Sequence, residues 1–106
     1  MDIRHYSGLI INGASIIGEC CTFFNAVTIG REFGGKKKGT PIIGNNVVIF
    51  AGAKIIGNVK IGNNVVIGAN SVVTKDVPDD CIVAGVPAKI ISNKVDEYIN
   101  HFGYKR

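Results

Sequence analysis

The sequence predicts an all-β fold, a parallel β-helix in which short strands spiral around one apolar interior. From Ile43 to Pro78 the chain repeats every six residues, and each block opens with a branched aliphatic side chain. These residues are Ile43, Ile49, Ile55, Ile61, Ile67 and Val73. The fifth place of each block is small or β-branched, at Val47, Ala53, Val59, Val65, Ser71 and Val77. A period of six fits neither a helix nor a lone strand, but it is typical of a chain that makes a short strand, turns and repeats.

Three blocks make one coil of eighteen residues with three faces, and successive coils are expected to stack about 4.8 Å apart. Residues eighteen apart then lie above one another, so the predicted stacks are Ile43 on Ile61, Ile49 on Ile67 and Ile55 on Val73. Burial of this column contributes about 25 cal/mol per Å². Glycine and asparagine at the corners, in 44–46 and 62–64, tolerate positive φ. A β-sandwich with frequent turns is the alternative, and six consecutive blocks in register argue against it.

The same register extends toward the N-terminus. It places aliphatic or aromatic side chains inside at Ile11, Ile17, Phe23 and Ile29, with Ser15, Cys21 and Val27 in the fifth places. Repeats are therefore expected from about residue 8, with nothing ahead of them to cap the first coil. Because neighbouring residues of a strand point to opposite sides, Cys21 is expected inside and Cys20 outside.

One segment interrupts the repeat. Ile29 and Ile43 are fourteen residues apart, two more than two blocks, and residues 31–41 (REFGGKKKGTP) carry no aliphatic residue at a core place. We expect an extruded loop here, and long loops in compact repeat proteins are usually functional. Its three lysines, 36–38, are either a solvated part of the loop or a group that attracts phosphates.

The C-terminal part departs from the repeat. Asp79 and Asp80 predict a turn, and residues 81–91 predict a last partial coil. Ser92 or Asn93 then caps a short predicted helix that ends at Gly103. Its apolar side consists of Val95, Tyr98, Ile99 and Phe102. The predicted division is a β-helix domain over 1–91 and a helical tail over 92–106, which closes the C-terminal end of the prism or packs on a neighbouring subunit.

Composition limits the function classes. The net charge of +4 is mild, lies largely in 36–38 and 105–106, and comes without an aromatic stripe, so it favours an anionic ligand over nucleic acid. No signal peptide and no run of eighteen apolar residues is present, which makes the cytoplasm the expected location and a membrane an unexpected partner. With two histidines and no C-x-x-C pair, no metal site is expected. A flat-sided solenoid with open ends is expected to form a cyclic homo-oligomer.

His5 is the candidate for acid–base chemistry. It precedes Ser7 and Gly8 at the start of a predicted strand, and an imidazole that titrates near neutrality can accept a proton from an attacking hydroxyl. From the residues alone, this role and that of an ordinary surface histidine both stay open. His101, in the predicted tail helix, is expected at the surface.

Residues 5–91 resemble the C-terminal β-helical domain of serine O-acetyltransferases, within the hexapeptide-repeat acyltransferase superfamily. The string IGNNVVIFAGAKIIGNVKIGNNVVIGANSVVTKDVP, followed by AGVPAKII, carries the resemblance. The tetrapeptide 5–8 (HYSG) is similar to the His-x-[Thr/Ser]-Gly of the family. The resemblance implies a left-handed β-helix, a hand that the residues alone do not supply because crossover connections are normally right-handed.

The resemblance also implies acetyl transfer from acetyl-coenzyme A to a hydroxyl, without a metal, with His5 as the catalytic base. It implies a homotrimer in which the pantetheine arm of the coenzyme runs between two subunits. The implied coenzyme contacts are Ala51, Gly52, Gly68, Ala69, Thr74 and Lys75, with Lys89 at the nucleotide end.

Three departures from the family leave the acceptor open. Arg4 stands where the family commonly has Asp, and Thr40-Pro41 replaces a His-Pro pair. The Asp that orients the catalytic histidine in the family has no counterpart, and Asp2 does not take its place. The expected acceptor is a small hydroxyl compound such as L-serine. The alternatives are a saccharide of surface polysaccharide synthesis and a non-catalytic trimeric β-helix that keeps the coenzyme groove.

Overall fold

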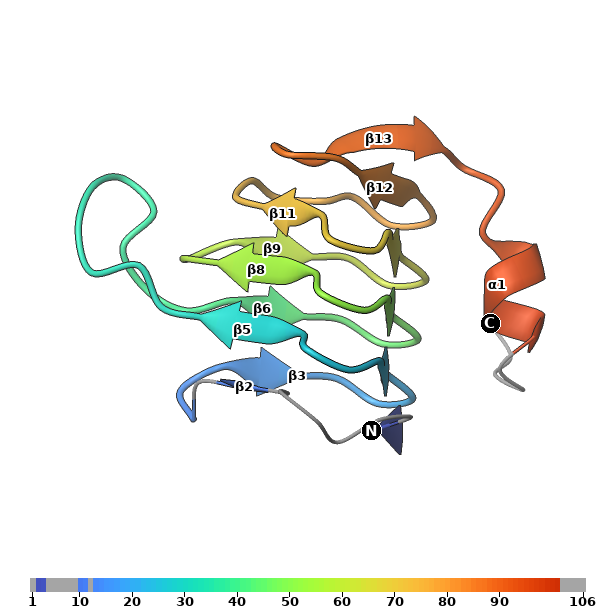
Figure 1. Cartoon of the computed structure of the whole chain (residues 1–106), viewed down its shortest axis with the longest axis horizontal. Helices are drawn as coiled ribbons and strands as arrows, with labels where there is room; N and C mark the ends of the chain where they lie inside the picture. The colour runs from blue at the N-terminus through green and yellow to red at the C-terminus, as the bar shows by residue number, and fades with distance from the viewer. Residues whose placement is uncertain (1, 4–9, 12, 102–106) are drawn as a thin grey trace.

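The computed structural model describes residues 2–3, 10–11 and 13–101, and it shows a three-sided prism of stacked coils (Figure 1). Three sheets form its sides. The first contains, in order, β1 (Asp2–Ile3), β4 (Thr22–Phe23), β7 (Val48–Ile49), β10 (Val66–Ile67), β12 (Ile82–Ala84) and β13 (Lys89–Ser92). The second contains β2 (Ile10–Ile11), β5 (Thr28–Gly30), β8 (Lys54–Ile56) and β11 (Val72–Val73). The third contains β3 (Ile16–Ile17), β6 (Ile42–Ile43) and β9 (Lys60–Ile61).

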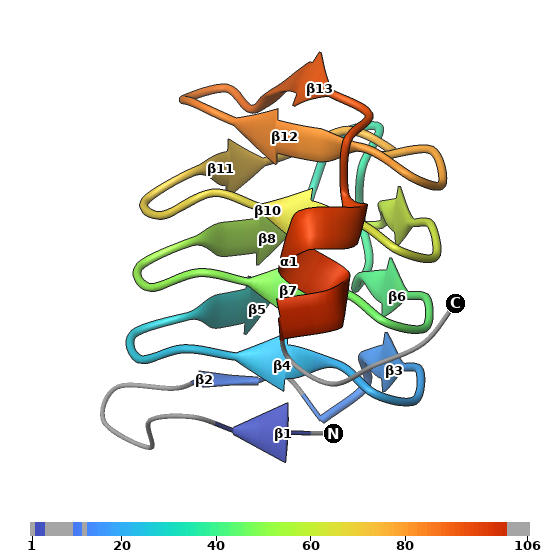
Figure 2. The ribbon, with the colours of Figure 1, turned by 90° about the vertical axis from the view of Figure 1, so that its right-hand side faces the viewer.

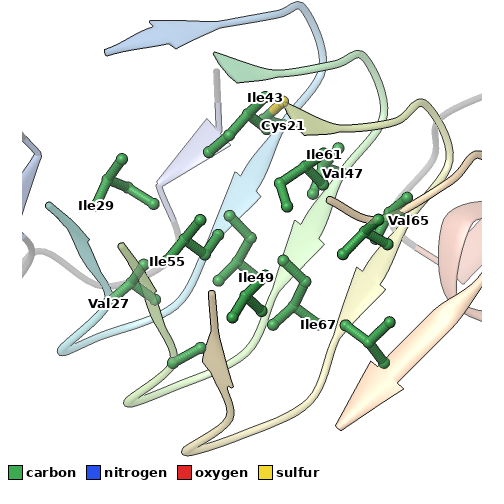
Figure 3. Close-up of a cluster of buried hydrophobic side chains, with 14 of the residues drawn as sticks. Cys21, Val27, Ile29, Ile43, Val47, Ile49, Ile55, Ile61, Val65 and Ile67 are labelled. Carbon is green, nitrogen blue, oxygen red and sulfur yellow. The ribbon is translucent and has the colours of Figure 1, made fainter. Parts of the chain in front are cut away.

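The predicted stacking register is confirmed. The parallel strands pair Ile43 with Ile61, Ile49 with Ile67 and Ile55 with Val73. These side chains form one interior column with the residues of the fifth places (Figure 3). The small fifth place at Ser71 is buried, and its Oγ accepts a hydrogen bond from Gly85 N at 3.2 Å. Cys21 is inside and Cys20 outside, as predicted.

The spiral is left-handed. In Figure 2 the first sheet lies in front and its strands β4 and β12 point left, whereas β8 and β11 of the second sheet lie behind and point right. The chain climbs from β1 at the bottom to β13 at the top. Seen from above, it therefore turns clockwise while it approaches the viewer, which is the hand that the resemblance implied.

The loop between β5 and β6 is extruded from the prism, as predicted (Figure 1). Thr22 pairs with Val48, so the coil that carries the loop has 26 residues instead of eighteen. The insertion is therefore eight residues within one face, and our count of two extra residues over two blocks was wrong. Glu32 and Gly39 form an antiparallel bridge at the base of the loop, with N–H···O distances of 3.0 and 2.9 Å.

The first strand of the spiral lies closer to the N-terminus than predicted. β1 pairs with β4 in register, Asp2 with Thr22 and Ile3 with Phe23, so a strand lies ahead of residue 8 and extends the first sheet by one step. Ile3 and its partner Phe23 are 20 residues apart, two more than one coil, so the six-residue register does not lead back to this strand.

The C-terminal end also differs from the prediction of a last partial coil. β12 continues the parallel stack on β10, but β13 then pairs antiparallel with β12. Gly85, with a φ of 103°, allows this reversal, because L side chains rarely adopt that conformation. The chain therefore folds back over its last coil.

The tail helix α1 (Asp96–His101) lies along the side of the prism, over the first sheet, and not across its end (Figure 2). The reason is an outward-facing apolar column on that sheet, Val48, Val66 and Ile82, against which Val95 packs. Among the described residues, no helix has the length and apolar character that a membrane span requires.

Candidate functional site

Most of the implied coenzyme contacts lie where the first sheet turns into the second, which we call the first corner (residues 24–27, 50–53 and 68–71). Each coil makes a tight turn there. Ala53 N donates to Phe50 O, and Ser71 N donates to Gly68 O, both at 3.3 Å. The third residue of each turn has positive φ, 59° at Ala26, 76° at Gly52 and 57° at Asn70. These are stacked β-turns, and the conformation of their third residue explains glycine or asparagine in two of them.

Ala51, Gly52, Gly68 and Ala69 are brought together in this corner, on two successive coils. Asn70 N donates to Ala51 O at 2.9 Å, which ties the upper turn to the lower one. A Cβ on Gly52 would collide with the Asn70 side chain, and one on Gly68 would lie 3.1 Å from the Ala84 Cβ. Gly52 therefore combines a positive φ with a close approach to the coil above, and Gly68 packs tightly beneath Ala84.

Lys89 lies above the same corner. It pairs with Ala84 of β12, which itself lies one strand above Gly68, and its side chain is exposed. Its ammonium group is available to an anionic group at the C-terminal end of the corner.

Thr74 and Lys75 lie elsewhere, at the next corner, where the second sheet turns into the third. Both are exposed and follow β11. Their neighbour Asp76 accepts a hydrogen bond from Lys60 N at 2.9 Å and lies 4.0 Å from Lys37 Nζ of the loop. The length of β11 separates them from Ala69, so one chain does not bring all the predicted contacts together.

His5 lies outside the described residues, as do Arg4 and the rest of the HYSG tetrapeptide. The preceding strand, β1, ends at Ile3 opposite Phe23, which is the residue before the first corner of the lowest complete coil. Thr40, which replaces a family histidine, uses its Oγ1 to donate to Ala14 O at 3.3 Å and so holds the end of the loop.

Two of the three thiols are buried. Burial raises the pKa of the Cys21 thiol above its ordinary value, although the Val47 backbone lowers it in part through a hydrogen bond. Burial, followed by the negative charge of Asp79, raises the pKa of the Cys81 thiol. Both thiols donate to carbonyl oxygens, Cys21 to Gly44 O at 3.2 Å and Cys81 to Pro78 O at 3.1 Å. They stay protonated at neutral pH and are structural.

A hollow lies beside the N-terminal coils of the prism. Its volume is about 740 Å³, and it is lined by Ile11, Ser15, Ile17, Gly18, Glu19 and Cys20. Two of the lining residues, Ile11 and Ile17, are partly buried and pack against the interior column.

Comparisons with known proteins extend this geometry. Residues 40–75 match the family described as bacterial transferase hexapeptide (six repeats). The serine acetyltransferase of Synechococcus elongatus is 46% identical over 91 residues, which are 84% of this chain and 36% of that protein. The crystal structure of Neisseria gonorrhoeae serine acetyltransferase in complex with serine matches with a TM-score of 0.76 and 41% identity, over 83% of this chain and 36% of that one. The chain belongs to the hexapeptide-repeat acyltransferase superfamily.

A further solved structure bears on the coenzyme. The serine acetyltransferase of Brucella abortus in complex with coenzyme A matches this hexapeptide-repeat chain with a TM-score of 0.80 and 37% identity, over 86% of this chain and 36% of that one. The chain thus spans a little over a third of the length of the relatives it matches.

The sequence reasoning missed an aromatic cluster beside the first corner of this hexapeptide-repeat protein. Phe24 and Phe50 stack with ring centroids 5.0 Å apart, and Tyr98 of α1 meets Phe50 edge-on at 5.9 Å. Phe24 and Phe50 each directly follow the strand residue of an inward place, and this shared position was the available signal. Within 2–3, 10–11 and 13–101, no three metal-ligating side chains come together.

Proposed function

We propose that this chain is an O-acetyltransferase that moves the acetyl group of acetyl-coenzyme A to a hydroxyl, in the manner of the serine acetyltransferases it resembles. The observation that carries the proposal is the first corner, where Ala51-Gly52 and Gly68-Ala69 stack beneath Lys89 in a chain 46% identical to a serine acetyltransferase. We further propose that it works in the cytoplasm.

The proposed chemistry uses His5 as general base. The acceptor oxygen attacks the thioester carbonyl while His5 Nε2 or Nδ1 takes its proton, and the same proton is returned to the leaving sulfur. Backbone N–H donors aimed at the carbonyl oxygen contribute a few kcal/mol each to the stabilisation of the developing charge. The coenzyme itself carries the activated acetyl group. The protein contributes by binding the coenzyme arm along the first corner, which positions the thioester for attack.

We propose that the complete site is formed between subunits of a homotrimer. Ala51 and Gly52 lie at the first corner of one chain, whereas Thr74 and Lys75 lie at the next corner. We propose that, in a closed ring of three prisms, the first corner of one subunit faces the other corner of its neighbour. Such an arrangement supports a coenzyme site that uses both sets of residues.

The replacement His5→Ala tests the catalytic proposal, with release of free thiol from acetyl-coenzyme A as the measurement. General-base catalysis contributes about 10²- to 10⁴-fold, so turnover should fall by that factor. His101→Ala is the matched control, because it removes the other of the two histidines, and it should keep wild-type turnover. Unchanged turnover in His5→Ala would contradict the assignment. Calorimetric titration with coenzyme A separates a failed base from a failed site.

The acceptor is proposed to be L-serine, which is the compound named in the complex of the Neisseria protein. A saccharide hydroxyl is the second candidate, favoured by Thr40, which stands where the family has a histidine and is engaged in holding the loop. Turnover with L-serine and with a panel of common sugars at equal concentration decides between them. Binding of coenzyme A without turnover on any acceptor would favour the non-catalytic remnant.

A further inference from the structure

The tail helix covers a surface that a β-helix would otherwise expose. Val48 and Val66 point outward from the first sheet, yet their exposed fractions are 0% and 1%. Val95, just ahead of α1, is 1% exposed and packs on them together with Ile82. The helix is therefore anchored to the same sheet whose strands lead into the first corner.

The same helix also reaches the corner through aromatic rings. Tyr98 lies edge-on to the Phe50 ring at 5.9 Å and an interplanar angle of 77°, while Phe24 stacks beneath Phe50 at 5.0 Å and 18°. The Phe50 ring is thus held on two sides, by the coil below and by the tail. Aromatic pairs in these two geometries are the favourable ones.

Phe50 is also the first residue of the turn that carries Ala51 and Gly52. Its N–H donates to Ile67 O at 2.9 Å, and its carbonyl accepts the turn-closing bond from Ala53 N at 3.3 Å. One coil above, the same position is Gly68, followed by Ala84 and then Lys89. This column therefore has aromatic rings at Phe24 and Phe50 and small residues, Gly68 and Ala84, above them. Phe50 is the last aromatic residue before the small ones.

We propose that Phe50 and Tyr98 are positioning residues for the coenzyme, and that α1 holds the first corner in its binding geometry through their contact. This inference rests on the proposed function, because it concerns the same corner. When the Tyr98 ring is present, Phe50 is fixed and with it the turn of Ala51 and Gly52. When that ring is removed, the Phe50 side chain gains rotamer freedom, and coenzyme binding must restore the order.

The test compares Tyr98→Ala, Tyr98→Phe and Glu97→Ala in the full-length chain. Tyr98→Ala should raise the KM for acetyl-coenzyme A and the Kd for coenzyme A about three- to tenfold, with kcat within twofold of wild type, because an aromatic pair contributes in that range. Tyr98→Phe keeps the ring and should restore wild-type values. Glu97→Ala changes the exposed neighbour on the same helix and should have no effect.

Phe50→Leu provides a second variant that keeps an apolar side chain in the column without a ring, and it should shift the same constants in the same direction. Unchanged KM and Kd in both Tyr98→Ala and Phe50→Leu would overturn the proposal. So would a fall in kcat at constant KM, or a failure of Tyr98→Phe to restore binding. If the wild-type protein does not bind coenzyme A, the proposed function fails. If the wild-type protein binds it and the variants bind it equally well, only the role of Phe50 and Tyr98 fails.

Discussion

At the scale of single residues, the glycines that leave the third sheet lie close to the backbone of the next coil. A Cβ on Gly44 would lie 2.8 Å from Gly62 O and 2.9 Å from its carbonyl carbon. Asn45 beside it donates its N–H to Asn63 Oδ1, and Asn63 donates in turn to Asp79 Oδ1, at 2.8 and 2.7 Å. Side-chain oxygens thus connect successive coils along this corner, and the lack of a Cβ at Gly44 leaves room for them.

We therefore expect Gly44→Ala to lower the free energy of unfolding by about 1–3 kcal/mol, because the new methyl group meets backbone that can only move with the coil above. Gly34→Ala is the control, since a Cβ there meets nothing within 4 Å and its φ is not in the left-handed region. It should stay within about 0.5 kcal/mol of wild type. Urea unfolding of the three proteins checks this, and an unchanged midpoint for Gly44→Ala would contradict the close stacking.

The two buried thiols should make the free energy of unfolding depend on pH in the alkaline range. The pKa values of Cys21 and Cys81 are raised by burial, so the folded chain keeps protons that an unfolded thiol loses above about pH 8.5. The unfolded state then binds fewer protons, and stability falls as pH rises, by up to about 1.4 kcal/mol per pH unit for each thiol. Urea unfolding between pH 8 and 10 should show a smaller decline in Cys21→Ala than in wild type. Cys20→Ser, at an exposed thiol, should decline like wild type, and equal slopes in all three would contradict the assignment.

The interior residues were predictable because a period of six constrains them strongly. Each of Ile43, Ile49 and Ile55 recurs with a partner eighteen residues later, and any shift by one residue would turn the column outward. The role of Phe50 was not predictable in this way, because its partner Tyr98 comes from the tail, and no repeat relates the two. The different corner of Thr74 and Lys75, by contrast, was within reach of the same period, because Ala69 lies one coil above Ala51 and Lys75 follows Ala69 by six residues, which is one face.

At the scale of elements, the extruded loop is an addition to a coil that closes without it. Glu32 and Gly39 pair at its base, so residues 33–38 leave and re-enter the prism at adjacent points. Its contact with the next coil includes a hydrogen bond from Asn58 N to Lys37 O at 2.9 Å. The sequence predicted the loop from its composition, but the bridge depends on backbone pairing that composition does not reveal.

Replacement of residues 33–38 by Asn-Gly should therefore leave thermal stability nearly unchanged. Shortening the loop from six residues to two lowers the closure entropy by about 1 kcal/mol, and loss of the Asn58–Lys37 bond costs about the same. Asn-Gly is suited to a two-residue hairpin turn. Differential scanning calorimetry should show a melting temperature within a few degrees of wild type. A loss of more than about 10 °C would show that the loop is part of the folding core, and turnover of the same variant reports whether the loop lysines serve the coenzyme.

The tail helix illustrates where element prediction failed. A helix with Val95 and Tyr98 on its apolar side was expected either at the end of the prism or on a neighbouring subunit, whereas Val95 packs on the first sheet of its own chain. Six residues are too few for a helix to be stable alone, so its position is decided by what it packs against. That surface was already visible in the doubled valines at 47–48 and 65–66, whose second member points outward and is apolar. Reading both members of each pair would have predicted a cover for the first sheet.

At the scale of the whole molecule, the prism exposes apolar side chains on the third sheet. Ile16 and Ile42 are direct neighbours there, because β3 pairs with β6, and their exposed fractions are 61% and 37%. The first sheet, by contrast, is covered by α1. Adjacent exposed aliphatic residues on a flat sheet favour association with another subunit, and a closed ring uses such a surface without leaving a free edge.

We therefore expect light scattering to give three times the monomer mass at micromolar concentration. Ile42→Glu should dissociate the assembly, because a carboxylate buried at such an interface lacks a partner. Lys54→Glu, exposed on the second sheet, changes charge at a polar surface and should leave the mass unaltered. If the site needs Ala51 and Gly52 from one subunit and Thr74 and Lys75 from the next, Ile42→Glu should also lose coenzyme A binding in calorimetry while circular dichroism still shows folded β-structure. Binding by a folded monomer with wild-type affinity would show that one chain holds the whole coenzyme site, and a monomeric wild type would remove the basis for a shared one.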